Sequence, residues 1–313
     1  MMDQEIIAPV STESIESELT ASAFLRDTNK GGNKIYVVDA HTAPNIMREI
    51  GRLREIAFRA GGGGTGKDCD IDEFDMMTPA CQQLIVWDPD ARMILGAYRF
   101  IKGENIVINP DGTPRIATAH MFNFSEKFMK EYLPYTIELG RSFVRLEYQS
   151  SKAGAKALFA LDNLWDGLGA LFVINPDIKY LFGKVTMYPS YDTECRDMLL
   201  YFFKKHFCDP DGLVTPIKPL EITTDTEVLK ALFAGADYAE DYKILNQEIR
   251  SHGINIPPLI NAYMNLSPTM RSFGTAINDE FGDVEETGIL MTISEMVEEK
   301  KHRHIDSFLQ QCD

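Results

Sequence analysis

The sequence predicts an α/β fold in which a mixed β-sheet is flanked by helices. Short segments rich in β-branched and aromatic residues alternate along the chain with longer segments of helical period. Strands joined through helices favour parallel neighbours in the sheet, whereas strands joined by a short turn favour an antiparallel pair. The hydrophobic fraction of 44% and the charged fraction of 25% are typical of a globular protein with a sizeable core. We expect an N-terminal arm, residues 1–33, followed by a single domain, residues 34–313.

The first half of the chain predicts an arm, a strand, a helix and a hairpin. The arm, residues 1–33, is polar and carries one short expected helix. A β-branched strand follows at residues 34–39, and apolar residues at helical spacing predict a helix at 43–60. Two further strands, 83–87 and 93–101, are separated by an Asp-Pro-Asp turn, which indicates a hairpin.

The second half alternates strands and helices around an insertion. The insertion, residues 209–265, reads as loop with short helices. The expected strands are 135–144, 180–187, 270–277 and 288–293, and the expected helices are 152–174, 195–207, 226–233, 238–250 and a charged C-terminal helix.

Charge and cysteine usage exclude several classes of protein. Acids outnumber bases by 47 to 31, and a net charge of −16 argues against a protein that coats nucleic acid. The five cysteines form no CxxC pair, which favours reduced thiols and a cytoplasmic location. The acidic start of the chain lacks the basic and apolar regions of a signal peptide. Residues 251–270 are free of Asp, Glu, Lys and Arg, but their three prolines argue against a membrane span.

Three local motifs resemble known sites and then depart from them. Residues 61–67 satisfy the GxxxxGK pattern of a phosphate-binding loop, but Asp68 stands where a Ser or Thr is needed for Mg²⁺. We expect a mobile loop near a substrate pocket instead. Residues 140–144 approach a nucleophile elbow, but Val144 replaces its last glycine. His302 and His304 lie at a basic helix end, where they complement the helix dipole, and no cluster has the spacing of metal ligands.

Charged residues in predicted strands and beside the glycine loop form a separated constellation. Its members are Arg54-x3-Phe58, Asp72-x2-Asp75 with Asp70 nearby, Arg99, and Glu138-x2-Arg141. Buried charges are costly unless they are paired, so we expect these groups to contact one another. Two interpretations remain open at this point: an ion-pair network that attaches the loop to the sheet, or a catalytic centre.

In this order, the motifs resemble the N-acyltransferases related to acyl-homoserine-lactone synthases, within the superfamily of GNAT-like folds. The local sequences of these motifs are closer still to those of the hemolysin-like bacterial acyltransferases that make ornithine lipids and glycine lipids. The resemblance covers roughly residues 34–293 and is carried by Leu53-Arg-Glu-Ile-Ala-Phe58, Asp70-Ile-Asp-Glu-Phe-Asp75, Glu138-Leu-Gly-Arg-Ser-Phe-Val144, Tyr180-Leu-Phe-Gly-Lys-Val185 and Ile256-Pro-Pro-Leu-Ile-Asn-Ala-Tyr263. It implies a GNAT-like mixed, splayed sheet flanked by helices.

Two departures from these relatives bear on the substrates. The homoserine-lactone synthases have an aromatic residue where this chain has its glycines, which puts an S-adenosylmethionine acceptor in doubt. Acetyl-CoA enzymes carry a Q/RxxGxG/A loop for the CoA diphosphate. Residues 149–155, Gln-Ser-Ser-Lys-Ala-Gly-Ala, are one residue too long for that loop and lack its first glycine. A carrier-protein donor has no CoA diphosphate, so the departure favours acyl-carrier-protein over acyl-CoA.

The resemblance implies transfer of a long-chain, 3-hydroxylated acyl group to a small amino acid, with glycine favoured and ornithine second. No cofactor is expected to be bound, because the acyl thioester is a co-substrate. Acyl-carrier-protein is the expected partner, with peripheral membrane contact for product release. The alternatives are a homoserine-lactone-type signal synthase and a non-catalytic, membrane-active protein.

The resemblance also implies roles for individual residues. Glu138, Arg141 and Arg99 are expected at the catalytic centre, where Glu138 is the general base and the arginines orient the carboxylates. The remaining expected site residues are Arg54, Phe58, Asp72, Asp75, Ser142 and Phe143. A basic patch of Arg145, Lys152 and Lys156, with Lys179 and Lys184 close by, is expected to receive the acidic carrier protein.

Overall fold

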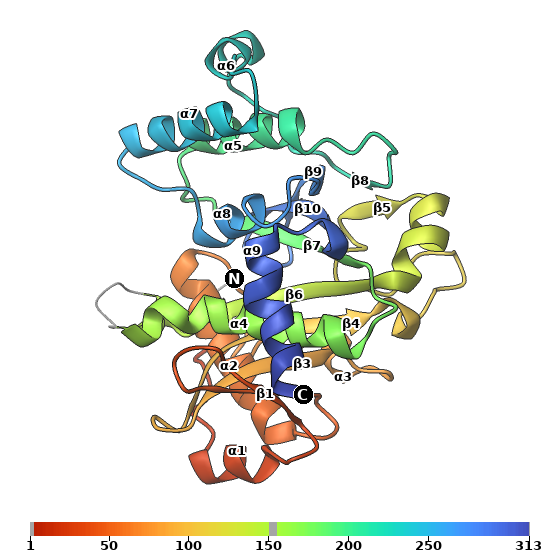
Figure 1. Ribbon diagram of the computed structural model, residues 1–313, viewed down its shortest axis with the longest axis vertical. Coiled ribbons are helices and arrows are strands. Elements are labelled where there is room, and N and C mark those ends of the chain that lie inside the picture. The colour runs from red at the N-terminus through yellow and green to blue at the C-terminus, as the bar shows by residue number, and fades with distance from the viewer. Residues whose placement is uncertain (1–2, 150–154, 313) are drawn as a thin grey trace.

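A computed structural model describes residues 3–149 and 155–312, and its side chains outside 155–158 and 311–312. Its centre is an eight-stranded sheet in the order β1-β2-β3-β4-β6-β7-β10-β9 (Figure 1). Its strands are β1 (Phe24–Asp27), β2 (Lys34–Val38), β3 (Gln82–Asp88), β4 (Met93–Lys102), β6 (Thr136–Val144), β7 (Tyr180–Met187), β9 (Arg271–Asn278) and β10 (Val284–Thr292). A separate two-stranded sheet pairs β5 (Phe122–Phe124) with β8 (Val214–Pro216).

Helices cover both faces of the sheet. The helices are α1 (Thr12–Glu18), α2 (Pro44–Gly61), α3 (Glu73–Met76), α4 (Ala155–Ile174), α5 (Thr193–His206), α6 (Thr226–Leu232), α7 (Tyr238–Ser251), α8 (Pro258–Met264), α9 (Glu298–Lys301) and α10 (Ser307–Cys312). One face packs against α2, and the other packs against α4, α5 and α8, while α7 packs against α5. These four helices share one large apolar core with β3, β4, β6 and β7. Among the described helices, none has both the length and the apolar character needed to cross a bilayer.

Helix α2 shows how local sequence sets an element's limits. Pro44 opens the helix, and Gly62, at a φ of 95°, closes it in the left-handed conformation that suits glycine. Ile46, Ile50 and Leu53 recur at helical spacing and are buried against the sheet. The helix ends beside the sheet's centre, which places the glycine loop at the edge of the site.

The sheet splays between β6 and β7. These two strands are parallel and pair only through Thr136–Tyr180, Ile137–Leu181 and Glu138–Phe182, although both strands continue well beyond this point. All the other neighbours in the sheet are antiparallel. Past Glu138, no strand of the described residues pairs with the β7 side of strand β6, and the gap can admit a ligand.

The expected mixed sheet with a splay is confirmed, and its central strands lie where the sequence predicted them. Three differences come from short or irregular elements. Strand β1 lies within the expected arm, where four residues gave no periodic signal. Strands β5 and β8 have three residues each, and β10 begins at Val284 rather than 288. The expected insertion contains β8, α6, α7 and α8. The boundaries of arm, domain and insertion remain a prediction.

Candidate functional site

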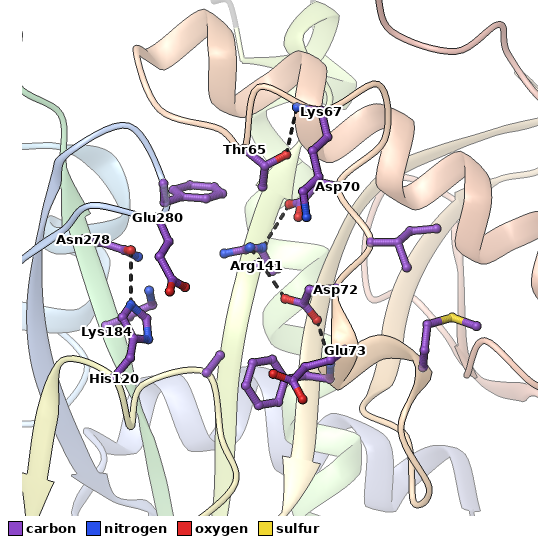
Figure 2. Close-up of a pocket in the computed structure, with 15 residues that line it drawn as sticks. Thr65, Lys67, Asp70, Asp72, Glu73, His120, Arg141, Lys184, Asn278 and Glu280 are labelled. Carbon is purple, nitrogen blue, oxygen red and sulfur yellow. Dashed lines mark hydrogen bonds and ion pairs between the residues drawn. The ribbon is translucent and has the colours of Figure 1, made fainter. Parts of the chain in front are cut away.

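A pocket of about 650 Å³ opens on the face of the sheet that carries α2 and α3. Segments distant in sequence meet there (Figure 2): the loop after α2, residues 70–76, strands β6 and β7, and the turn between β9 and β10. A smaller cavity of about 60 Å³ lies at the splay and is lined by Leu139, Gly140 and Ser142 of β6. Arg141, Lys184 and Phe281 line both cavities, so the two spaces meet at these three side chains.

A fully buried arginine on α2 connects the helix to the sheet. Arg54 Nη1 donates to Asp75 Oδ2 at 3.0 Å, and its Nη2 donates to Gln83 Oε1 at 2.6 Å. The same Nη1 also reaches the Asp70 backbone carbonyl at 3.3 Å. Arg54, Asp75 and Gln83 are each 0% exposed. These contacts fix α2, the acidic segment and strand β3 to one another, as the sequence predicted for Arg54 and Asp75.

Arg99 of β4 holds the start of α3. Its Nη1 lies 2.7 Å from both carboxylate oxygens of Asp72 and 3.4 Å from Asp75 Oδ2. Asp72 also caps α3 by accepting from the Phe74 and Asp75 backbone amides. Burial raises the pKa of Asp72, but the Arg99 charge and hydrogen bonds outweigh burial and hold that pKa well below its usual range. Asp72 is therefore an ionised, positioned carboxylate rather than a base.

Arg141 occupies a bulge in strand β6. Its φ of 47° is left-handed, and the register between β4 and β6 shifts at this point. Arg141 Nε lies 2.9 Å from Asp70 Oδ2, and its Nη2 lies 3.6 Å from Asp72 Oδ2. The guanidinium lies over the Phe281 ring at 4.3 Å from its centre, and Phe281 packs edge-on against Phe58 at 5.1 Å. The expected pairing of Arg141 with carboxylates is present, with Asp70 as its nearest partner.

Glu138 lies outside this network. It sits directly opposite Ile101 of β4 and is 2% exposed, on the same face of the sheet as Arg99. Burial raises the pKa of Glu138 to about 7, although the charges of Arg99 and Lys184 act in the opposite direction. Within the described residues, no hydrogen bond or ion pair holds the Glu138 carboxyl group. The expectation that the arginines orient Glu138 is therefore wrong, because their donors are directed to Asp70, Asp72 and Asp75.

An ion pair between two late strands borders the site, and the sequence did not predict it. Lys184 lines both cavities, and Glu286 lines the smaller one. Lys184 of β7 pairs with Glu286 of β10 at 2.7 Å, and Thr186 donates to the same carboxylate at 2.7 Å. Burial raises the pKa of Glu286, but Lys184 and these donors lower it overall. Lys184 was expected near the carrier-protein patch, and the structure instead buries it in the site. In the sequence, the alternating pattern of residues 180–187 indicates on which face of the sheet Lys184 lies. No local motif indicates that its partner is Glu286.

The glycine loop lies beside the pocket and is held by hydrogen bonds to α2, and its expected mobility remains a prediction. The buried Glu55 carboxylate accepts from the Thr65 and Gly66 amides and from the Thr65 hydroxyl. Backbone amides of the kind that bind phosphate in a nucleotide-binding loop are therefore already taken by an internal carboxylate. Thr65 and Lys67 line the pocket wall.

Several predicted residues lie away from the main pocket. Phe143 is 4% exposed and packs in the core beneath α2, because the bulge turns it to that face. Ser142 borders only the smaller cavity. Arg145 lies 3.3 Å from Glu147, an acidic partner that weakens the expected basic patch. Lys152 lies outside the described residues, and the side chain of Lys156 is likewise not described.

Three side chains near the start of α5 form a group that could hold a metal ion. Asp192, Cys195 and His252 bring their ligand atoms within 4.8 Å of one another. Asp192 is the N-cap of α5 and accepts from the Cys195 amide at 2.9 Å, which gives this proximity a structural reason. None of the three lines the pocket.

Comparisons with known proteins agree with this architecture. Residues 53–158 match the family model described as an acetyltransferase (GNAT) domain. A protein of Phocaeicola vulgatus named glycine N(alpha)-acyltransferase is 63% identical, over 98% of this chain and 94% of its own length. A protein of the same name from Bacteroides thetaiotaomicron is 62% identical, over 98% of this chain and 91% of its own length.

A solved CoA-dependent acyl-homoserine lactone synthase, BjaI, is 11% identical with a TM-score of 0.35, over 90% of this chain and 89% of its own. Identity above 60% along nearly the whole chain decides the assignment. This chain belongs to the family of glycine N(alpha)-acyltransferases and is an acyltransferase with a GNAT fold.

Proposed function

We propose that this protein transfers a long-chain acyl group from a thioester donor to the amine of glycine. The relatives that share over 60% identity are named for glycine, which supports this acceptor over ornithine. The observation that carries the chemistry is Glu138, a buried carboxyl with a pKa of about 7 at the point where the sheet opens. A base of this pKa can take up and release a proton near neutral pH.

The proposed reaction is direct attack in a ternary complex. The amine nitrogen attacks the thioester carbonyl carbon, the C–N bond forms, and Glu138 accepts a proton from the nitrogen directly or through water. The tetrahedral intermediate then collapses, the C–S bond breaks, and the thiolate leaves and takes up the proton. Atoms and charge balance without a covalent acyl-enzyme.

The splay provides a site for the carbonyl group of the donor. Beyond Glu138, strand β6 no longer pairs with β7, so backbone groups on that edge are available to a ligand. A backbone N–H there is our candidate to stabilise the negative charge that develops on the carbonyl oxygen. Arg54 holds Asp75 and Arg99 holds Asp72, which lines the main pocket.

The donor is proposed to be a 3-hydroxylated acyl group on acyl-carrier-protein. The departure of residues 149–155 from the diphosphate-binding pattern of acetyl-CoA enzymes supports a carrier protein over CoA. Arg145, Lys152 and Lys156 remain the proposed contacts for the acidic partner, although Arg145 already pairs with Glu147. We expect apolar residues of α4 and the late strands to accommodate the chain.

The experiment is incubation of the purified protein with acyl-carrier-protein or acyl-CoA and a panel of amino acids, followed by mass spectrometry of the lipid product. We expect N-acylglycine, formed faster from acyl-carrier-protein. Products with S-adenosylmethionine only would indicate a signal synthase, and vesicle lysis without any donor would indicate a membrane-active protein. Either result contradicts the proposal.

A further inference from the structure

We infer that the Arg141 guanidinium binds the carboxylate of the amino-acid acceptor, so that the site selects free α-amino acids over amines and amides. The inference rests on the proposed function and assigns acceptor recognition within the same site. It begins with the bulge in β6. Gly140 pairs with Arg99 and Phe143 pairs with Ala97, so two residues of β6 oppose the single residue Tyr98. The extra residue makes a bulge in β6. Within this bulge Arg141 has a left-handed φ of 47°, and its side chain points to the pocket face.

Two contacts then orient the guanidinium within the pocket. Asp70, which is 1% exposed, lies 2.9 Å from Nε on the strand side. The Phe281 ring covers one face of the guanidinium plane. The Nε atom is buried, while the side chain as a whole keeps 13% of its surface exposed. Figure 2 shows Arg141 extending toward the middle of the cavity, between the Asp70 side and the Glu280 side. Asp70 and Phe281 thus hold the Arg141 guanidinium so that its terminal nitrogens face a ligand in the pocket.

The other pocket cations are less suited to a carboxylate. The single ammonium of Lys184 lies 2.7 Å from Glu286, whereas Arg141 contacts Asp70 through Nε and has two terminal nitrogens beyond that contact. Lys67 is an exposed residue of the glycine loop and offers a single flexible ammonium. A guanidinium edge matches the two oxygens of a carboxylate, which an ammonium cannot do with the same geometry. Arg141 therefore has the chemistry and the orientation required.

This assignment also places the acceptor for reaction. In an α-amino acid the amine is attached to the carbon that bears the carboxylate, so fixing the carboxylate confines the nitrogen to its neighbourhood. Arg141 borders both the main pocket and the small cavity at the splay, and it lies on the same strand as Glu138. A carboxylate held by Arg141 from the main pocket would direct the amine toward the splay and the thioester.

The test compares glycine with glycinamide, which keeps the amine and replaces the carboxylate by a neutral amide. Rates are measured with one acyl donor at a fixed pH for wild type, Arg141→Lys and Arg271→Lys. Arg271 is the matched control, because its guanidinium also pairs with carboxylates and lies over an aromatic ring, Tyr132, but does not line the pocket. The difference in amine basicity between the two acceptors cancels when the same ratio is compared across variants.

We expect wild type to prefer glycine, and the ratio of kcat/KM for glycine over glycinamide to fall about tenfold to a hundredfold in Arg141→Lys. The loss should lie mainly in KM for glycine, with KM for the donor unchanged, and Arg271→Lys should keep the wild-type ratio. The inference is overturned if wild type has the same kcat/KM for glycinamide as for glycine. It is also overturned if the ratio of kcat/KM for glycine over glycinamide falls in Lys184→Met but not in Arg141→Lys. In both cases acyl transfer to glycine itself persists, so the proposed function would stand. Absence of N-acylglycine from wild type would instead refute the function.

Discussion

Replacing Glu138 by Gln is predicted to stabilise the fold while it removes most of the activity. Burial raises the pKa of Glu138 from an ordinary 4.5 to about 7. The folded state therefore binds this proton more tightly than the unfolded state, and the resulting stability is lost as pH rises from 4.5 through about 7. The interval corresponds to about 3 kcal/mol of stability that is absent at pH 8. Gln cannot ionise, so the variant should recover this amount.

Urea unfolding at pH 5 and pH 8 measures the effect, and Glu286→Gln is the matched control. Glu286 is also buried, but Lys184 lowers its pKa overall, so its charge contributes stability at pH 8. We expect Glu138→Gln to exceed wild type by up to about 3 kcal/mol at pH 8 and by much less at pH 5, and Glu286→Gln to fall below wild type at pH 8. Turnover by Glu138→Gln should drop about a hundredfold or more. A Glu138→Gln protein that is less stable than wild type at pH 8, or that keeps its turnover, would refute the reasoning.

Three further predictions concern the ion network, the donor and the fold. Arg141→Ala should lose activity and about 3–5 kcal/mol of stability, measured by urea unfolding, because the buried Asp70 carboxylate loses its cation; an unchanged melting temperature would contradict this. Reversing Lys152 and Lys156 to Glu should raise KM for acyl-carrier-protein and flatten its salt dependence while KM for glycine stays constant; equal use of acyl-CoA by wild type with no response to the reversal would defeat the carrier-protein proposal. Gly103→Ala should lower stability by at least about 2 kcal/mol in thermal unfolding, since a Cβ there would lie 1.7 Å from a backbone carbonyl oxygen, and full retention would show that the turn can shift.

The ion-pair network was predictable from the sequence because each of its members carries a local signal. Arg54 lies one helical turn before Phe58, and Asp72 precedes Asp75 by the spacing of a helix cap. Arg99 interrupts an otherwise apolar strand. Charges in such positions must find partners, and the structure pairs them with one another.

The remaining part of the site depends on contacts between distant strands. Lys184 and Glu286 are 102 residues apart and meet only because β7 and β10 are neighbours in the sheet. Phe281 reaches Arg141 from a turn that no motif marks. The isolation of Glu138 follows from the register of β4 and β6, which sequence spacing does not specify. The short strand β1 was missed for a related reason, since four residues contain too little periodicity to indicate a strand.

The pH dependence of single-turnover acyl transfer tests the central claim most directly, that Glu138 receives the amine proton during acylation of glycine. With enzyme in excess over donor and with saturating glycine, the wild-type rate should rise with pH and level off above about pH 7, because the base must be ionised to act. Glu138→Gln should react about a hundredfold more slowly and without this rise. A rise with the same midpoint in Glu138→Gln would assign the ionisation to another group, and it would contradict the account.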